Sequence, residues 1–302
     1  MPLETDLNKL LNENYHHVRD SEIHLKIREF IRNNDSVLEG DDPFFIKRLT
    51  KVGRRFPHTF FSKHELEQLI RFSFEGSQLI SVRGYHNSIK NKVMAHFDST
   101  AADFAGILYE KLKGNPQEKS ERMHLLNVAY DSNVRAAVSQ EKEDPIYSSR
   151  CLAQAALSAE RFYDETGDVY WLETSAIYNY TIAKSFEEAI PDFASKHYAL
   201  ASSAAQKMFS KSRAIEDLKT SHEFSVQSAK LIKNSRRRAA NSYSYAADSA
   251  RELYVLTNDR TWRDAALQYY DSFLEQVERD TSVASQQTIN KINDTIKKLN
   301  RA

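Results

Sequence analysis

The chain has 302 residues, long enough to bury a large core, and its 42 lysines and arginines balance 42 aspartates and glutamates. A net charge of zero removes the general electrostatic argument for a nucleic-acid-binding or membrane-surface protein. Seven glycines and six prolines are few for this length, which favours helices joined by short turns over β-structure with many tight turns.

Two helices are predicted before residue 40, at Leu3–Glu13 and Ser21–Asn33. The first lies in polar sequence that lacks the apolar core of a signal peptide. In the second, Ile23, Ile27 and Ile31 recur on one face of the helix. No window of the chain approaches ~18 apolar residues, so we expect no membrane-spanning segment and a cytoplasmic protein.

Residues 43–64 combine basic and phenylalanine side chains and contain no acidic residue. Cations neutralise phosphate and aromatic rings stack on unpaired bases, so the segment is a candidate site for RNA or another anionic partner. The alternative is a helix that packs its phenylalanines inward and leaves its basic face in water. The candidate binding residues are Lys47, Arg48, Lys51, Arg54 and Arg55.

A further helix is predicted to begin at Ser62, with Glu65 completing a capping box, and to end at about His96. Near its end, the run IKNKVMAHFDS resembles the motif of HEPN-type helical domains, many of which are metal-independent ribonucleases. The resemblance implies that Lys90 holds phosphate, that Asn91 matches the polar position, and that His96 is the acid or base acting on a ribose hydroxyl. Otherwise, His96 is an ordinary helix-end residue that interacts favourably with the helix dipole.

Helix pairs are predicted from about Ser99 onward. The first helix ends at Gly114, which Asn115 and Pro116 follow, and a return helix runs over residues 118–140. The only cysteine, Cys151, lies in an apolar helical run, which indicates a core residue rather than a nucleophile. A single cysteine also excludes an intramolecular disulfide and is typical of a reducing compartment.

A segment of roughly 29 residues occurs three times, starting at Ser158, Ala204 and Ser249. A period near ~45 residues is typical of a solenoid of stacked helix pairs. Small residues let neighbouring helices approach closely, and we expect the shared aromatic residues to pack between them. The first and third copies share Tyr163 and Tyr254, Thr166 and Thr257, Asp168 and Asp259, Trp171 and Trp262, and Tyr178 and Tyr269.

The turn within each pair is predicted from two adjacent residues. Gly167 and Asn258 tolerate the left-handed conformation that ends a helix, and Asp168 and Asp259 are good N-caps for the helix that follows. The middle copy has Arg213 at this place, followed by alanine. We therefore expect a longer or irregular turn there, and a bend in the stacking.

The run YDETGD, followed by an aromatic residue and an alanine- and tyrosine-rich helix, resembles tetratricopeptide (TPR) and related repeats over about Ala101 to Val277. This resemblance implies an all-α fold, a right-handed α-α superhelix of antiparallel helix pairs, and work as a scaffold or adaptor. We expect an N-terminal helical region at residues 1–98, repeats at residues 99–280 and a C-terminal capping helix at residues 281–302. The last helix has one apolar stripe of Ile289, Ile292, Ile296 and Leu299.

Three functions follow from these patterns. The first is a non-enzymatic scaffold or adaptor that binds a protein partner in a groove lined by the first helix of each pair. The second is an RNA-binding adaptor that uses residues 43–64. The third is a HEPN-like ribonuclease or toxin-type protein that uses Lys90, Asn91 and His96. The histidines lack metal-ligand spacing, and the chain has no phosphate-binding glycine loop, so we predict no metal and no cofactor.

Overall fold

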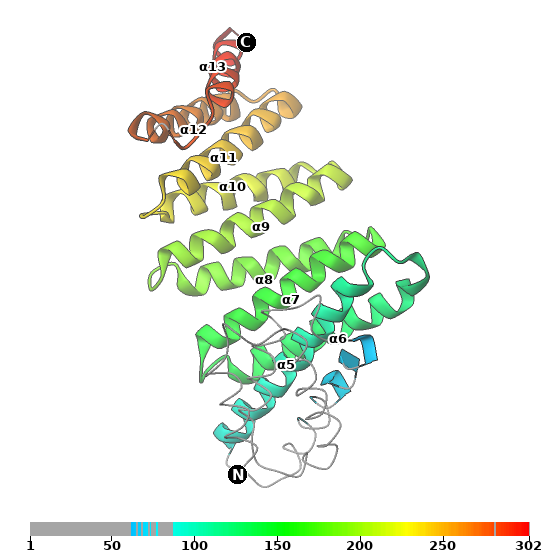
Figure 1. Ribbon diagram of the computed structural model, residues 1–302. Coiled ribbons are helices and arrows are strands. Elements are labelled where there is room, and N and C mark those ends of the chain that lie inside the picture. Colours follow the sequence, from blue (N-terminus) through cyan, green and yellow to red (C-terminus); the bar gives the residue numbers. More distant parts are fainter. Residues whose placement is uncertain are drawn as a thin grey trace, which may run out of the picture. The chain divides into compact units, whose positions relative to one another are not determined.

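A computed structural model describes residues 62–64, 66–67, 69–71, 73, 77, 87–280 and 282–301. Every regular element within these ranges is a helix, so the described part of the chain is all-α, as predicted (Figure 1). The chain divides into two compact units, Met1–Ser148 and Ser149–Ala302, and each is described by itself. The helices predicted before residue 40 lie outside the described residues.

In the first unit, α5 (Asn87–Leu112) packs against α6 (Lys119–Gln140), and the short helix η2 (Pro116–Glu118) lies between them in the chain. Gly114 has a φ of 97° in the turn after α5, which confirms the predicted helix end. The predicted helix end near His96 is wrong, because α5 continues through this point. No glycine or proline occurs in α5 before Gly106, and the hydroxyls of Ser99 and Thr100 donate to the His96 carbonyl within the same helix.

The start of α7 (Pro145–Thr166) is fixed to α5 and α6 by two hydroxyl groups. The Tyr147 hydroxyl lies 2.7 Å from the Ser99 hydroxyl and 3.0 Å from the Ala95 carbonyl. The Ser148 hydroxyl donates to the Ala137 carbonyl at 2.8 Å. The last residue of the predicted N-terminal region, at position 98, therefore lies inside a helix of this packed unit.

In the second unit, helices follow one another in chain order, coloured green to red in Figure 1. Phe162 of α7 stacks on Trp171 of the next helix, with ring centroids 4.2 Å apart, and from there each helix packs on its successor. This order confirms the predicted succession of helix pairs. The helices after α7 are α8 (Tyr170–Phe186), α9 (Pro191–Ser212), α10 (Ile215–Leu231), α11 (Arg236–Thr257), α12 (Arg260–Arg279) and α13 (Gln286–Arg301).

The turns inside the three pairs share one backbone geometry. Gly167, Arg213 and Asn258 have φ values of 72°, 57° and 54°, and each amide donates to the carbonyl four residues earlier, at 2.7 to 2.8 Å. The expectation of a longer or irregular turn at Arg213 is wrong, because arginine itself takes the left-handed conformation. The predicted bend in the helix stacking was inferred from an irregular turn at Arg213, so it loses that basis.

The start of the second helix differs among the pairs, as the sequence indicates. Asp259 accepts a hydrogen bond from the Thr261 amide, which confirms it as the N-cap of α12. Asp168 accepts from the Tyr170 amide but lies one residue before the N-cap of α8, Val169. Ala214 has no side chain to do this. Instead, the hydroxyl of the preceding serine, Ser212, accepts from the Ala214 amide at 3.0 Å and donates to an Asp217 carboxylate oxygen at 2.6 Å.

Small side chains fill the contacts between α9, α10 and α11. The alanines on their inward faces are buried, and serine hydroxyls contact one another across the helices. The Ser228 hydroxyl lies 2.9 Å from the Ser242 hydroxyl of α11 and 3.2 Å from the Ser195 hydroxyl of α9. A second group joins Ser202 of α9 to Ser225 of α10 at 2.7 Å. The interfaces between these closely packed helices therefore contain serine hydroxyls as well as alanine methyl groups.

A buried histidine joins α8 to α9. The Nδ1 atom of His197 lies 2.9 Å from Oδ1 of Asn179, and the Asn179 amide group donates to the Ser175 carbonyl at 3.1 Å. The amide oxygen is therefore an acceptor, so His197 carries its proton on Nδ1. Burial, with a smaller contribution from the charge of Lys196, lowers the pKa of His197 to about 4.

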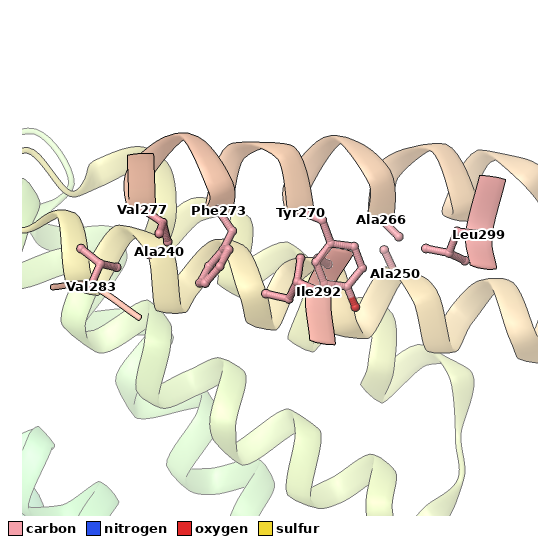
Figure 2. Packing of buried hydrophobic residues seen from close by; sticks show 10 residues of the cluster. Ala240, Ala250, Ala266, Tyr270, Phe273, Val277, Val283, Ile292 and Leu299 are labelled. Atoms are coloured by element: carbon pink, nitrogen blue, oxygen red, sulfur yellow. The ribbon is translucent and has the colours of Figure 1, made fainter. Parts of the chain in front are cut away.

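The C-terminal helix packs its apolar stripe on the two helices before it. Ile292 and Leu299 of α13 are buried against α11 and α12 (Figure 2). Ile289 and Ile296 pack beside them. The other side of α13 is polar and exposed. This cluster also contains the repeat residues Tyr254, Trp262 and Tyr269, which confirms their role in packing. Cys151, on α7, is buried as predicted.

Candidate binding site

The residues that the sequence singles out for an anionic partner lie outside the described part of the chain. They are Lys47, Arg48, Lys51, Arg54 and Arg55. A second basic run, at the start of α11, is described and is engaged with protein groups. Arg236 donates to the Arg279 carbonyl at 2.9 Å, and Arg238 lies 3.6 Å from an Asp192 carboxylate oxygen. This run therefore ties helix ends together.

The HEPN-like residues all lie on α5, where Asn91 and His96 are half-buried. Successive residues of an α-helix are about 100° apart around its axis, so Lys90, Asn91 and His96 occupy three different sides of α5. The helix alone does not bring them to one face. The carbonyl of His96 is engaged by the hydroxyls of Ser99 and Thr100.

A partly open hollow of about 290 Å³ lies in the second unit. On one side it is lined by Tyr180 and Lys184 of α8 and by Glu187, just beyond the end of that helix. Tyr198 of α9 contributes to the same side and is 2% exposed, whereas Tyr180 is 39% exposed. Tyr198 therefore belongs to the floor of the hollow and Tyr180 to its rim.

The rest of the lining comes from α10 and α12. Tyr269 of α12 is half-buried there, and it also packs on the C-terminal cluster. His222 is buried, Phe224 is half-buried and Glu223 is exposed. The complete contribution of α10 is His222, Glu223, Phe224, Val226 and Gln227.

The rings of the hollow contact one another across helices. Tyr180 of α8 stacks on Phe224 of α10 with centroids 5.3 Å apart and meets the edge of Tyr198 at 6.1 Å. His222 of α10 meets Tyr269 of α12 at 5.4 Å. The lining thus holds two groups of rings, one that joins α8 to α10 and one that joins α10 to α12.

The charges on the α8 side are paired. The Lys184 ammonium donates to a Glu187 carboxylate oxygen at 2.8 Å, and the Tyr198 hydroxyl donates to the other oxygen. These bonds hold the pKa of Glu187 below its usual range, while burial and then this bond raise the pKa of the Tyr198 phenol. At neutral pH the group is therefore an ammonium, a carboxylate and a phenol.

His222 is uncharged at neutral pH. Its Nδ1 atom lies 2.9 Å from the Ala246 carbonyl oxygen, which can only accept, so the proton is on Nδ1. Burial lowers the pKa of His222, against the opposite effect of that carbonyl and of Glu223. The floor of the hollow next to α12 therefore carries no positive charge.

The hollow differs from the predicted groove. It is lined mainly by the second helices, α8, α10 and α12, whereas the sequence suggested the first helices. One signal was available: the aromatic positions of the second helix recur in the copies as Tyr178, Phe224 and Tyr269. Two of these line the hollow, but α8 places Tyr180 there instead of Tyr178. That choice depends on which side of α8 is covered by its neighbours.

Among the described residues, no three histidine, cysteine, aspartate or glutamate side chains gather as metal ligands would. None of the helices in the described ranges is both long enough and apolar enough to cross a membrane.

No protein-family model and no curated protein matches the chain. Among solved structures, it is similar to one described as "Computational Design of Self-Assembling Cyclic Protein Homooligomers". The identity is 12%, over 91% of this chain and 95% of the other, with a TM-score of 0.24.

Proposed function

We propose that the protein is a non-enzymatic helical-repeat adaptor that binds a segment of a partner protein in the hollow between α8, α10 and α12. The observation that carries this proposal is the shared aromatic lining from three successive pairs, with Tyr180 partly open to solvent. Rings that combine an apolar body with a polar tip are enriched in protein interfaces. A volume of about 290 Å³ suits one or two side chains of a partner better than a larger organic ligand.

The right-handed TPR-like superhelix belongs to the same proposal. It is supported by helix pairs that follow one another in chain order and by the left-handed residue that ends the first helix of each pair. The cytoplasm is the proposed place of action, which the single buried cysteine fits. The RNA-binding and ribonuclease hypotheses stay predictions, and no contact of the described residues favours either.

The test is recovery of partners from an extract of the protein's own cells, with the full chain as bait. Wild type is compared with Tyr180→Ala, which removes a rim ring. The matched control is Tyr245→Ala, which removes a tyrosine of α11 that is 64% exposed and lies outside the hollow. Equal helical content and melting temperature of the three baits show that any difference arises at the surface.

We expect a set of proteins that wild type and Tyr245→Ala retain and Tyr180→Ala loses, with recovery unchanged by nuclease. Recovery that is indifferent to Tyr180→Ala would show that the hollow is not the binding site. Recovery abolished by nuclease would favour the RNA-binding adaptor instead.

A further inference from the structure

We infer that the hollow receives a basic side chain of the partner segment, arginine in preference to lysine. This inference rests on the proposed function and specifies its ligand. The rings, the charges at the rim and the neutral His222 support it.

The rings favour a cation. Tyr180 and Phe224 stack face to face, and Tyr180 remains 39% exposed, so aromatic surface is open to a ligand at the rim. The face of such a ring is electron-rich and attracts a positive charge placed over it. Tyr269 adds a second aromatic surface from α12.

The charges favour a cation as well. The charge of Lys184 is balanced by Glu187, whose carboxylate lies 2.8 Å away. Glu223 stands exposed at the rim, and among the described residues it makes no ion pair. One ammonium therefore faces two carboxylates, which leaves the lining with a surplus negative charge. A partner's cation would meet an unpaired carboxylate, whereas an anion would have to compete with Glu187 for Lys184.

The floor adds no opposing charge. His222 donates its Nδ1 proton to the Ala246 carbonyl and is neutral at pH 7, so it does not repel a cation. A guanidinium group is planar and weakly hydrated, so it stacks on tyrosine or phenylalanine while its edge donates to a carboxylate. An ammonium group cannot make both contacts in one plane, which is why arginine is preferred.

The test uses a display library of random peptides of about 12 residues, selected on the immobilised full chain and counter-selected on Tyr180→Ala. Synthetic peptides that survive are then titrated against wild type and variants. Glu223→Gln removes the rim carboxylate at constant shape. Lys184→Met keeps the aliphatic stem and removes the ammonium. The matched control is Glu278→Gln, an exposed glutamate of α12 outside the hollow.

Selected peptides are expected to share a basic position, arginine most often. Replacing it by glutamine weakens binding about tenfold, and replacing it by lysine weakens binding less. Glu223→Gln is expected to weaken binding about fivefold, and Lys184→Met to leave it equal or tighter. Glu278→Gln has no effect.

The opposite pattern overturns the inference and leaves the proposed function standing. It consists of peptides that need Tyr180 but have no basic position, or whose binding falls with Lys184→Met. If no peptide depends on Tyr180, the proposed function itself fails.

Discussion

At the scale of single residues, the turns inside the helix pairs show how one backbone geometry accommodates different side chains. Gly167 and Asn258 are common at left-handed positions, whereas Arg213 is not. Two side-chain contacts offset part of the strain that the left-handed conformation places on Arg213. Its guanidinium lies 5.6 Å from the centre of the Phe209 ring and 4.0 Å from a Glu252 carboxylate oxygen. Both contacts lie near an exposed side chain and are weak, so the backbone strain dominates.

Arg213→Gly is expected to be more stable than Arg213→Ala by about 1 kcal/mol. Both variants lose the same side-chain contacts, and only alanine keeps a Cβ in the left-handed conformation. The measurement is the free energy of unfolding from urea titration. Gly167→Ala serves as the companion variant and should cost about the same amount. Equal stability of the glycine and alanine variants at 213 would contradict this account.

His197 is expected to make stability depend on pH. Its pKa is about 4 in the folded chain, and about 6.5 is the ordinary value. Above pH ~6.5 both states are neutral and the effect is absent. As the pH falls from ~6.5 to ~4, the unfolded chain binds a proton that the folded chain does not, so stability falls by up to about 3 kcal/mol.

The check is the urea midpoint between pH 7 and pH 4 for wild type and His197→Gln. Glutamine does not titrate, so the variant should lose less stability on acidification than wild type. His124→Gln, at an exposed histidine of α6, is the control and should follow wild type. Parallel curves for wild type and His197→Gln would refute a role for this histidine.

At the scale of helices, small residues determine how closely neighbours pack. Alanines such as Ala201, Ala205, Ala246 and Ala250 are fully or almost fully buried. The serines between them satisfy their hydroxyls within the interface, so a polar side chain can stand where a methyl group would otherwise pack. Such an interface has little room for a longer side chain, because helix backbones lie close on both sides.

Ser228 tests this at the contact of α9, α10 and α11. Ser228→Ala removes hydroxyl contacts to Ser195 and Ser242 and should cost about 1 kcal/mol in the free energy of unfolding. Ser228→Leu must also displace neighbouring helices, so it should cost about 3 kcal/mol. Ser203→Leu, at an exposed position of α9, should be nearly neutral. If Ser228→Leu costs no more free energy of unfolding than Ser228→Ala, the interface is loosely packed.

At the scale of the whole molecule, the features that the sequence predicted correctly are those set by local pattern. Asp259 caps α12 because of its own side chain, and the stripe of Ile292 and Leu299 fixes which side of α13 is buried. Residues whose role depends on distant neighbours were not predictable in this way. Arg213 follows the geometry of the pair around it, and α5 runs on past His96 because nothing local stops it.

The hollow is also a feature that depends on residues far apart in the chain. Tyr180, Phe224 and Tyr269 are far apart in the chain and come together only when α8, α10 and α12 are stacked. The repeat identified two of the three, since they stand at equivalent positions of the copies. The charges at the rim carried no such signal, because Lys184 and Glu187 look like any solvated pair three residues apart until Tyr198 is placed beside them.

The order of packing in the second unit has a mechanical consequence. From α8 onward, each helix packs on its neighbours in the chain. Force applied to the two ends of this unit would therefore load the helix–helix interfaces in series. The hollow is lined from α8 to α12. A ligand bound there would contact α8 and α12 at the same time and so link the two ends of this group of helices. A ligand bound in the hollow would make α8 to α12 harder to separate. By the same coupling, tension that separates these helices would weaken the binding of the ligand.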